Sequence, residues 1–167
     1  MPKGDFIRRM ATNHWKMKLF MLQHLPMAWL AGLRVIYLDH QRAEVSIPHK
    51  YLNKNPFKSM YFATQAMAAE LSTGIIAMAA VKDAKVPISM LVLRMKSSFI
   101  KKATTKIVFS CEDGMAIENA ISLANKTNEG QTIIAKSIGK NTAGQIVSEF
   151  EFEWTFKTKT EQNKNTA

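Results

Sequence analysis

The sequence predicts an α+β domain in which one long apolar helix is wrapped by a curved antiparallel sheet. Residues 57–81 are rich in Ala and Met and are apolar on nearly every helical face. A helix that is apolar all round has to be buried all round. Residues 146–157 alternate apolar and charged side chains, the pattern of a strand with one buried and one wet face. With 167 residues, 47% of them hydrophobic, the chain is long enough for one such core.

The first part of the chain is expected to place an extra helix ahead of the strands. Residues 1–12 are polar, and we expect them to be flexible. Asn13 is a residue type that caps helices, and the apolar residues after it predict an N-terminal helix over residues 13–31, broken near Pro26. The single domain is therefore expected to span residues 13–157.

Two short strands are predicted next, over residues 34–39 and 43–47, because apolar and polar side chains alternate there. A loop follows over residues 49–54. Asn55 suits a helix cap and Pro56 suits the first helical position, so the long helix is expected to begin at this pair.

Beyond the long helix the sequence predicts mostly sheet. Pro87 ends the helical segment. The predicted strands cover, in order, residues 88–99, 104–111, 132–138 and 146–157. A short amphipathic helix is predicted after the Asp113-Gly114 turn, with one apolar face made of Ile117, Ala120, Ile121 and Ala124. Residues 158–167 are expected to form a flexible polar tail.

The composition narrows the choice of partners. The net charge is +10, from 23 Lys and Arg against 13 Asp and Glu, which favours anionic partners. The basic residues are scattered and no nucleic-acid-binding motif occurs, so we expect no nucleic-acid partner. The four histidines do not stand at metal-ligand spacing, and we expect no metal.

The same composition bears on the compartment. Cys111 is the single cysteine, which excludes an internal disulfide and favours a reducing environment. Its strand-like surroundings predict a buried apolar role rather than a nucleophile. Residues 19–33 carry no charged side chain but are fewer than the roughly 20 needed to span a bilayer. We expect a cytoplasmic protein with no stable membrane insertion.

The order of the predicted elements resembles the hotdog superfamily, and within it the DUF4442 group, which is related to the PaaI-type thioesterases. The resemblance covers about residues 26–157. It rests on LNKNPFKSMYFATQAMAAELSTG (residues 52–74), on SMLVLRMKSSFIKKA (residues 89–103) and on the closing aromatic strand.

The resemblance implies an acyl-CoA thioesterase-like protein with a catalytic Asn55 and Glu70. In the related thioesterases an Asn precedes the central helix and an acid follows within it, and these two residues match those places. Phe62 and Ala63 stand where the relatives have a Gly pair, which lets the helix backbone approach the thioester carbonyl closely. That departure keeps a second interpretation open, a non-catalytic acyl or lipid carrier of the same fold.

Glu70 is a candidate catalytic residue on its own sequence context, without the resemblance. It is the only acid between Glu44 and Asp83, within the most apolar stretch of the chain. Burial disfavours the charged form and raises the pKa of a carboxyl group, which suits a general base near neutral pH or a nucleophile. The alternative is a structural acid that pairs with a hydroxyl or Lys of a neighbouring chain.

The other candidate residues surround the start of the same helix. Tyr61, Phe62, Ala63 and Gln65 are expected to line the substrate cleft, although core packing is equally compatible with them. Lys101 and Lys102 are placed to hold the phosphates of coenzyme A, with a merely solvated surface as the alternative.

The expected partners are an acyl-CoA or another acyl thioester and a second copy of the chain. Coenzyme A would enter as part of the substrate, and no separate cofactor is expected. Two sheets joined edge to edge would remove exposed strand edges, which predicts a homodimer and leaves a tetramer open. A hotdog dehydratase is a further alternative with His49 as the catalytic histidine, but the Pro-Gly turn that such enzymes carry does not follow it.

Overall fold

The structure, a computed structural model, describes residues 3–159 of the chain. The helices are α1 (Lys3–Thr12), α2 (His14–His24), α3 (Pro26–Ala31), α4 (Phe62–Asp83) and α5 (Gly114–Thr127), with a 3-10 turn at Tyr51–Asn53. The strands are β1 (Arg34–Leu38), β2 (Ala43–Ile47), β3 (Ile88–Phe99), β4 (Ile107–Cys111), β5 (Gln131–Lys140) and β6 (Ile146–Thr158).

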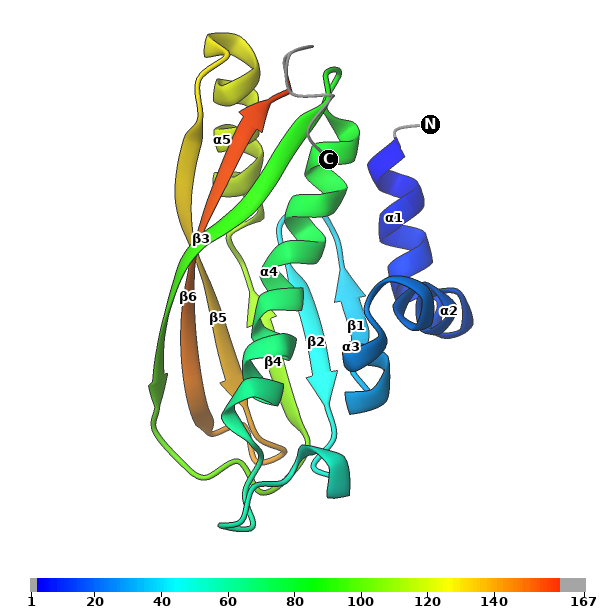
Figure 1. Cartoon of the computed structure of the whole chain (residues 1–167), viewed down its shortest axis with the longest axis vertical. Helices are drawn as coiled ribbons and strands as arrows, with labels where there is room; N and C mark the ends of the chain where they lie inside the picture. Colours follow the sequence, from blue (N-terminus) through cyan, green and yellow to red (C-terminus); the bar gives the residue numbers. More distant parts are fainter. Residues whose placement is uncertain (1–2, 160–167) are drawn as a thin grey trace.

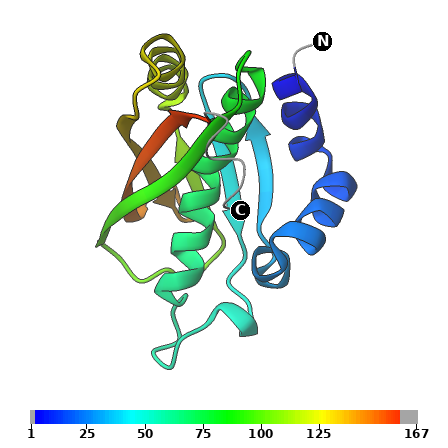
Figure 2. The same cartoon turned by 45° about the horizontal axis from the view of Figure 1, so that its top comes forward.

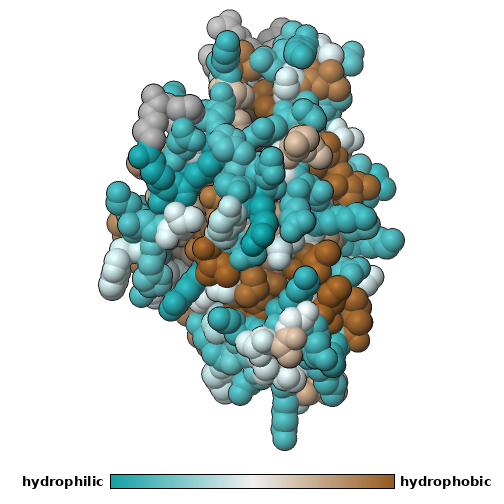
Figure 3. Space-filling view, turned by 180° about the vertical axis from the view of Figure 1, so that it is seen from behind, coloured by the Kyte–Doolittle hydropathy of each residue, from teal (hydrophilic) through white to brown (hydrophobic). Residues whose placement is uncertain are grey.

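One six-stranded sheet curls around helix α4 (Figure 1). Its strand order is β1-β2-β4-β5-β6-β3, and every neighbouring pair is antiparallel. Strands β1 and β3 form its two edges, and helices α1 to α3 stand beside β1, on the far side of the molecule from β3 (Figure 2). A long central helix wrapped by an antiparallel sheet is the hotdog arrangement, so the predicted fold class is confirmed. The opposite face of the sheet is largely hydrophilic and is crossed by a band of hydrophobic side chains (Figure 3).

Three polar contacts fix α4 against the sheet. The Ser148 hydroxyl on β6 donates to the Gln65 amide oxygen at 2.9 Å. About two turns later along α4 the Ser72 and Ser137 hydroxyl oxygens lie 2.7 Å apart. The Trp154 indole N–H donates to the Thr73 hydroxyl at 3.0 Å. Buried polar groups are costly when unpaired, so these contacts select one register of the helix on the sheet.

Helix α4 is long and apolar enough to cross a membrane when judged by length and composition alone. However, 67% of its most hydropathic window is buried inside the domain. Its apolar surface is therefore taken up by the sheet, by α1 and by α5, as in the core helix of a globular domain. The cytoplasmic location expected from the sequence stays a prediction.

The expectation that residues 1–12 are flexible is wrong for the described part, because residues 3–12 form helix α1. Ile7 and Ala11 are buried on one face of it. The Arg8 guanidinium, 7% exposed, lies 2.7 Å from the Asp83 carboxylate at the end of α4, which also accepts the Gly4 N–H at 2.7 Å. A charge pair made across a long sequence separation leaves no local pattern in the sequence.

The predicted N-terminal helix is present but divided. Asn13 caps α2 as expected, its side-chain oxygen accepting the Lys16 N–H at 3.1 Å. Pro26 starts the separate helix α3 because proline fits the first turn of a helix and cannot continue one. Gly32 ends α3 with a φ of 80°, a left-handed conformation that favours glycine.

The predicted start of the central helix is wrong. Helix α4 begins at Phe62, and Asn55 instead opens a tight turn. The Asn55 side-chain oxygen accepts the N–H groups of Phe57 and Ser59, and its backbone oxygen accepts the Lys58 N–H. Asn followed by Pro suits a turn as well as a helix cap, because in both the Asn oxygen accepts a backbone N–H two or more residues later.

The strand predictions after α4 are confirmed, with shifts of a few residues at the ends of β4 and β5. The aromatic side chains at alternate positions of β6 are buried, as predicted, namely Phe150, Phe152, Trp154 and Phe156. Ile146 lies outside this row because the β5–β6 register shifts beside it, and its side chain is exposed. Of the predicted flexible tail, residues 160–167 lie outside the described residues.

Gly114 at the start of α5 offers a test of this packing. An added Cβ would lie 2.1 Å from the His40 backbone oxygen and 2.6 Å from the Gln41 Cα atom, and backbone cannot yield as a side chain can. We expect Gly114→Ala to lower the free energy of unfolding by about 1–3 kcal/mol, although Ala favours helix. Urea unfolding measures the change. Gly130→Ala is the control, since nothing lies nearer than the Thr155 hydroxyl at 3.9 Å, and equal effects of both substitutions would contradict the close approach.

Candidate active site

A pocket of about 560 Å³ opens at the start of helix α4. It lies between the turn before the helix and the segment that leaves β3. Six of the residues predicted from the sequence line it together, namely Asn55, Tyr61, Phe62, Gln65, Lys101 and Lys102. The two remaining candidates, Ala63 and Glu70, are not among its lining residues.

Asn55 is held firmly at the rim of this pocket. Its side-chain oxygen accepts three hydrogen bonds, from the N–H groups of Phe57 and Ser59 and from the Ser59 hydroxyl. Among the described residues its amide nitrogen has no partner. The turn thus fixes the orientation of the side chain and leaves the N–H donors of Asn55 available to a ligand.

The first turn of α4 offers two more donors. Tyr61 occupies the N-cap position without a side-chain hydrogen bond, and its backbone oxygen accepts the N–H groups of Thr64 and Gln65. Within residues 3–159 the N–H groups of Phe62 and Ala63 have no acceptor, as is usual for the first residues of a helix. These donors and the helix dipole make the helix start favourable for an oxygen atom that carries negative charge.

Aromatic rings form the apolar wall of the pocket. Phe62 packs edge to face on Tyr61 and on Phe99, with ring centroids 5.0 and 6.4 Å apart. About half of the surface of each of these three side chains is exposed. Gln65, in contrast, uses both ends of its amide, since its nitrogen donates to the Met60 backbone oxygen and its oxygen accepts from Ser148. Gln65 therefore shapes the wall and does not offer a free polar group.

Two lysines stand at the open side of the pocket. Lys101 and Lys102 are exposed, and the Lys101 ammonium donates to the Gln145 side-chain oxygen at 2.8 Å. The backbone N–H of Lys101 donates to the Val147 oxygen, which anchors the segment to the start of β6. The arrangement places two cations beside an apolar opening.

Glu70 lies farther along α4, on a half-buried face that turns towards β6. A Cβ added to Gly74 would lie 3.1 Å from a Glu70 carboxylate oxygen and 3.3 Å from the Trp154 ring, so these three residues meet. Within the described chain the carboxylate has no hydrogen bond or ion pair. Burial raises the pKa of the Glu70 carboxyl group above its ordinary value of 4.5.

Within one chain, Glu70 and the pocket are separated. Glu70 follows Phe62 by eight helical positions, a rise of about 12 Å at 1.5 Å per residue. The half-buried face that joins them carries Ala63, Ala66 and Met67. The sequence thus predicted the residues of two locations on one helix, and the structure does not bring them to one point within a single chain.

Sequence reasoning missed some residues that shape these locations. Phe99 and Ile100 belong to the pocket, and both side chains are exposed. The available signal in the sequence was a pair of apolar residues directly before two lysines. Asn53, fully buried, donates to the backbone oxygens of Ala31 and Pro48 and so ties the loop before the pocket to α3. No local pattern separates such an Asn from an ordinary loop residue. His49, the histidine of the dehydratase alternative, does not line the pocket.

Comparison with known proteins places the chain in a family. The sequence pattern of the family described as "Domain of unknown function (DUF4442)" matches residues 13–156. The chain belongs to the DUF4442 family. No curated protein sequence matches it.

Solved structures share the fold of this DUF4442 protein at low sequence identity. A Pseudomonas aeruginosa protein of unknown function, described as a probable thioesterase, matches with a TM-score of 0.71 at 16% identity, over 93% of this chain and 95% of its own. A Chlorobaculum tepidum protein of unknown function gives a TM-score of 0.74 at 15% identity, over 87% and 94%. A thioesterase from Haemophilus influenzae gives 0.61 at 10% identity, over 87% and 92%.

Other chemistries find less support in the DUF4442 chain. Cys111 is buried as expected, and burial raises the pKa of its thiol to about 12, so almost none of it is thiolate at neutral pH. Within residues 3–159 no group of three or more His, Cys, Asp or Glu side chains is arranged so that it could hold a metal ion. That the protein works without a metal stays a prediction.

The raised pKa of Glu70 has a consequence for stability. Between its unfolded-state and folded-state values the folded protein binds the additional proton, so ionisation of Glu70 destabilises the fold as the pH rises through that window. We expect Glu70→Gln to raise the melting temperature at pH 8, with the gain shrinking towards pH 4. Calorimetry of both proteins across this range measures it. A gain that does not change with pH would contradict a carboxyl group desolvated in the fold.

Proposed function

We propose that this DUF4442 protein is an acyl-CoA thioesterase-like enzyme that hydrolyses an acyl thioester with Glu70 as the general base. The observation that supports this most directly is the Glu70 carboxyl group, whose pKa is raised by burial and which has no partner among residues 3–159. It lies on the helix whose first turn borders the pocket and offers N–H groups that no other described residue accepts. Of the three structural neighbours named above, one is described as a thioesterase and one as a probable thioesterase, which agrees with this chemistry.

The proposed substrate position follows from the lining of the pocket. The thioester carbonyl oxygen would lie at the start of α4 and accept the N–H groups of Phe62 and Ala63. The Asn55 amide would donate a further hydrogen bond, and the aromatic wall would contact the apolar part of the ligand. Lys101 and Lys102 would lie near the phosphates of coenzyme A, where a cation contributes chiefly to binding.

In the proposed reaction a water oxygen attacks the thioester carbonyl carbon while the Glu70 carboxylate takes a proton from that water. The carbonyl oxygen becomes an oxyanion, which the helix N–H groups stabilise. As the tetrahedral intermediate collapses, the C–S bond breaks and the leaving sulfur receives the proton from Glu70. A carboxyl group with a raised pKa suits both proton transfers. Direct attack by the Glu70 carboxylate, through an anhydride, is the alternative route.

A second copy of the chain would bring the two locations together. Strand β3 is an edge of the sheet, and Met95 and Phe99 on it remain about half exposed. Antiparallel pairing of two β3 edges about a twofold axis would also make the two α4 helices antiparallel. Glu70 of one copy would then approach the start of α4 in the other. We therefore propose a homodimer with shared sites, and a tetramer would pair two such dimers.

A non-catalytic acyl carrier is the second candidate, and Phe62 favours it. In place of a glycine this ring stands half exposed at the helix start, where it restricts the approach of a thioester to the backbone N–H groups. A carrier of this kind would bind acyl-CoA in the same pocket and release no thiol.

A panel of acyl-CoA substrates of different chain length decides between the two, with free thiol as the readout. We expect turnover by the wild type and a loss of at least about 100-fold in kcat for Glu70→Gln, since general-base catalysis contributes roughly 10²–10⁴-fold. Glu129→Gln is the matched control, because Glu129 is an exposed acid on a distant loop. Equal rates in all three proteins would remove Glu70 from the mechanism, and binding without turnover would favour the carrier.

Association can be tested through the exposed inner side of β3. Met95→Glu would place a carboxylate in the proposed interface, away from water, whereas in a monomer the position is 45% exposed. We expect a dimer in the wild type and a concentration-dependent shift to monomer in the variant, measured by light scattering. Met115→Glu, at a position 61% exposed on α5, is the matched control. A monomeric wild type, or a Met95→Glu dimer as tight as the control, would argue against this interface.

A further inference from the structure

Helix α2 is apolar on two opposite faces, and the domain covers only one of them. Met17 and Met21 are buried against the domain, with 3% and 2% exposed. On the opposite face Trp15, Leu19 and Leu22, spaced four and three residues apart, are 76%, 57% and 47% exposed. Residues four and seven apart share one side of a helix, so these three side chains form a stripe that points away from the core.

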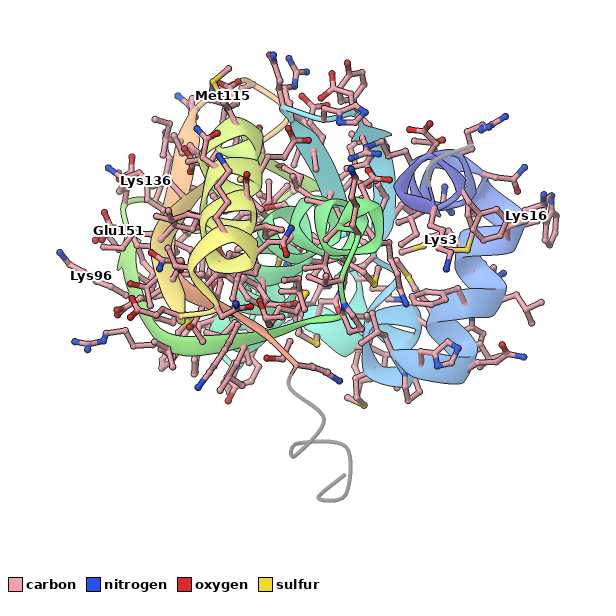
Figure 4. All side chains as sticks on the ribbon, turned by 90° about the horizontal axis from the view of Figure 1, so that it is seen from above. Lys3, Lys16, Lys96, Met115, Lys136 and Glu151 are labelled. Atoms are coloured by element: carbon pink, nitrogen blue, oxygen red, sulfur yellow. The ribbon has the colours of Figure 1, made fainter. Side chains whose placement is uncertain are left out.

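The segment that follows, which includes helix α3, also exposes apolar side chains. After Leu22 the chain exposes Leu25, Met27 and Leu30, at 40%, 62% and 44%. We call these six residues, Trp15, Leu19, Leu22, Leu25, Met27 and Leu30, the N-terminal apolar patch. Helix α2 is the outermost of the helices beside β1, and Lys16 projects from it away from the sheet (Figure 4). The patch therefore faces outward from the β1 side, opposite the β3 edge proposed for the dimer.

The charge around the patch is of one sign. From Phe6 to Leu38 the sequence has no Asp or Glu, whereas its exposed basic residues are Arg9, Lys16, Lys18 and Arg34. On α2 the exposed Lys16 and Lys18 flank the stripe on its two sides. The Lys18 ammonium lies 5.7 Å from the centre of the Trp15 ring, so the cation stays next to the apolar side chains.

A groove of about 770 Å³ adjoins the patch at Leu30 and is also lined by apolar and basic residues. Helices α2 and α3 form one side of it and strand β1 the other. Its basic lining residues are His14, Lys18, Arg34, Lys50 and Lys106, and in the described structure no acid lines it. The Lys50 ammonium also donates to the Leu30 backbone oxygen, which holds this cation next to a residue of the patch.

We propose that the N-terminal apolar patch docks this protein onto a membrane surface that carries anionic lipids. The apolar side chains would enter the interface between headgroups and acyl chains, where Trp is favoured, while Lys16, Lys18 and the groove cations contact lipid phosphates. This is peripheral attachment and needs no spanning segment. A second copy fits less well, because an isologous contact would bring the same lysines of both chains together.

Vesicle sedimentation tests the proposal with the full chain. We expect binding to vesicles of phosphatidylcholine mixed with phosphatidylglycerol, little binding to phosphatidylcholine alone, and weaker binding as salt is raised. The double variants Leu19→Ser with Leu22→Ser and Lys16→Glu with Lys18→Glu should each lower the partition coefficient by roughly tenfold or more. All four positions are exposed, and thermal unfolding verifies that each variant is folded.

The control replaces equally exposed apolar residues elsewhere, Met115→Ser with Ile134→Ser, at positions 61% and 59% exposed. This variant should bind the mixed vesicles as the wild type does. Absence of binding to the mixed vesicles, or equal loss in the control, would overturn the proposal. So would a wild-type oligomer in solution that the Leu19→Ser with Leu22→Ser variant abolishes without any vesicle binding, because the patch would then join copies of the chain.

Discussion

Helix α4 carries apolar side chains around most of its circumference, and the need to remove them from water determines where the other elements lie. The sheet curls over one side, α5 closes one end and α1 covers the flank that the sheet leaves open. Buried hydroxyl groups on the helix have partners, which the sheet supplies for Ser72 through Ser137 and the backbone of Tyr61 supplies for Thr64. Glu70 is the exception, a largely buried acid without a partner among residues 3–159, which makes it a candidate for chemistry.

The parts of the fold that follow from local patterns were predictable. The aromatic residues at alternate positions of β6 and the apolar residues of α4 each predict burial from the pattern within one segment. The start of α4 was misplaced because Asn55 and Pro56 fit a turn and a helix cap equally well. Helix α1 was missed because its anchor is the contact between Arg8 and Asp83, residues that the sequence keeps 75 positions apart. Patterns within a segment predict its type, whereas contacts between segments decide where polar segments settle.

The candidate site shows the same division. Residue types, together with the resemblance to hotdog thioesterases, were sufficient to select six residues that share the pocket at the helix start, and also Glu70. They did not show that the pocket and Glu70 are separated along one helix. Spacing in a sequence does not say whether both parts of a site come from one chain or from two copies of it. The half-exposed inner side of β3 gives the structural reason to consider a second copy. The β3 edge and the N-terminal apolar patch lie on opposite sides of the molecule. The patch is flanked by lysines, whereas the inner side of β3 exposes Met95 and Phe99.

The meeting of Trp154, Gly74 and Glu70 has a practical consequence. The indole is 4% exposed and is fixed by its hydrogen bond to Thr73, and its ring borders the same small space as the carboxylate. Emission from an indole responds to a nearby charge and to water. Trp154 is thus a native optical reporter at the acid, whose signal can be separated from that of the exposed Trp15 and Trp29 by its shielding from soluble quenchers.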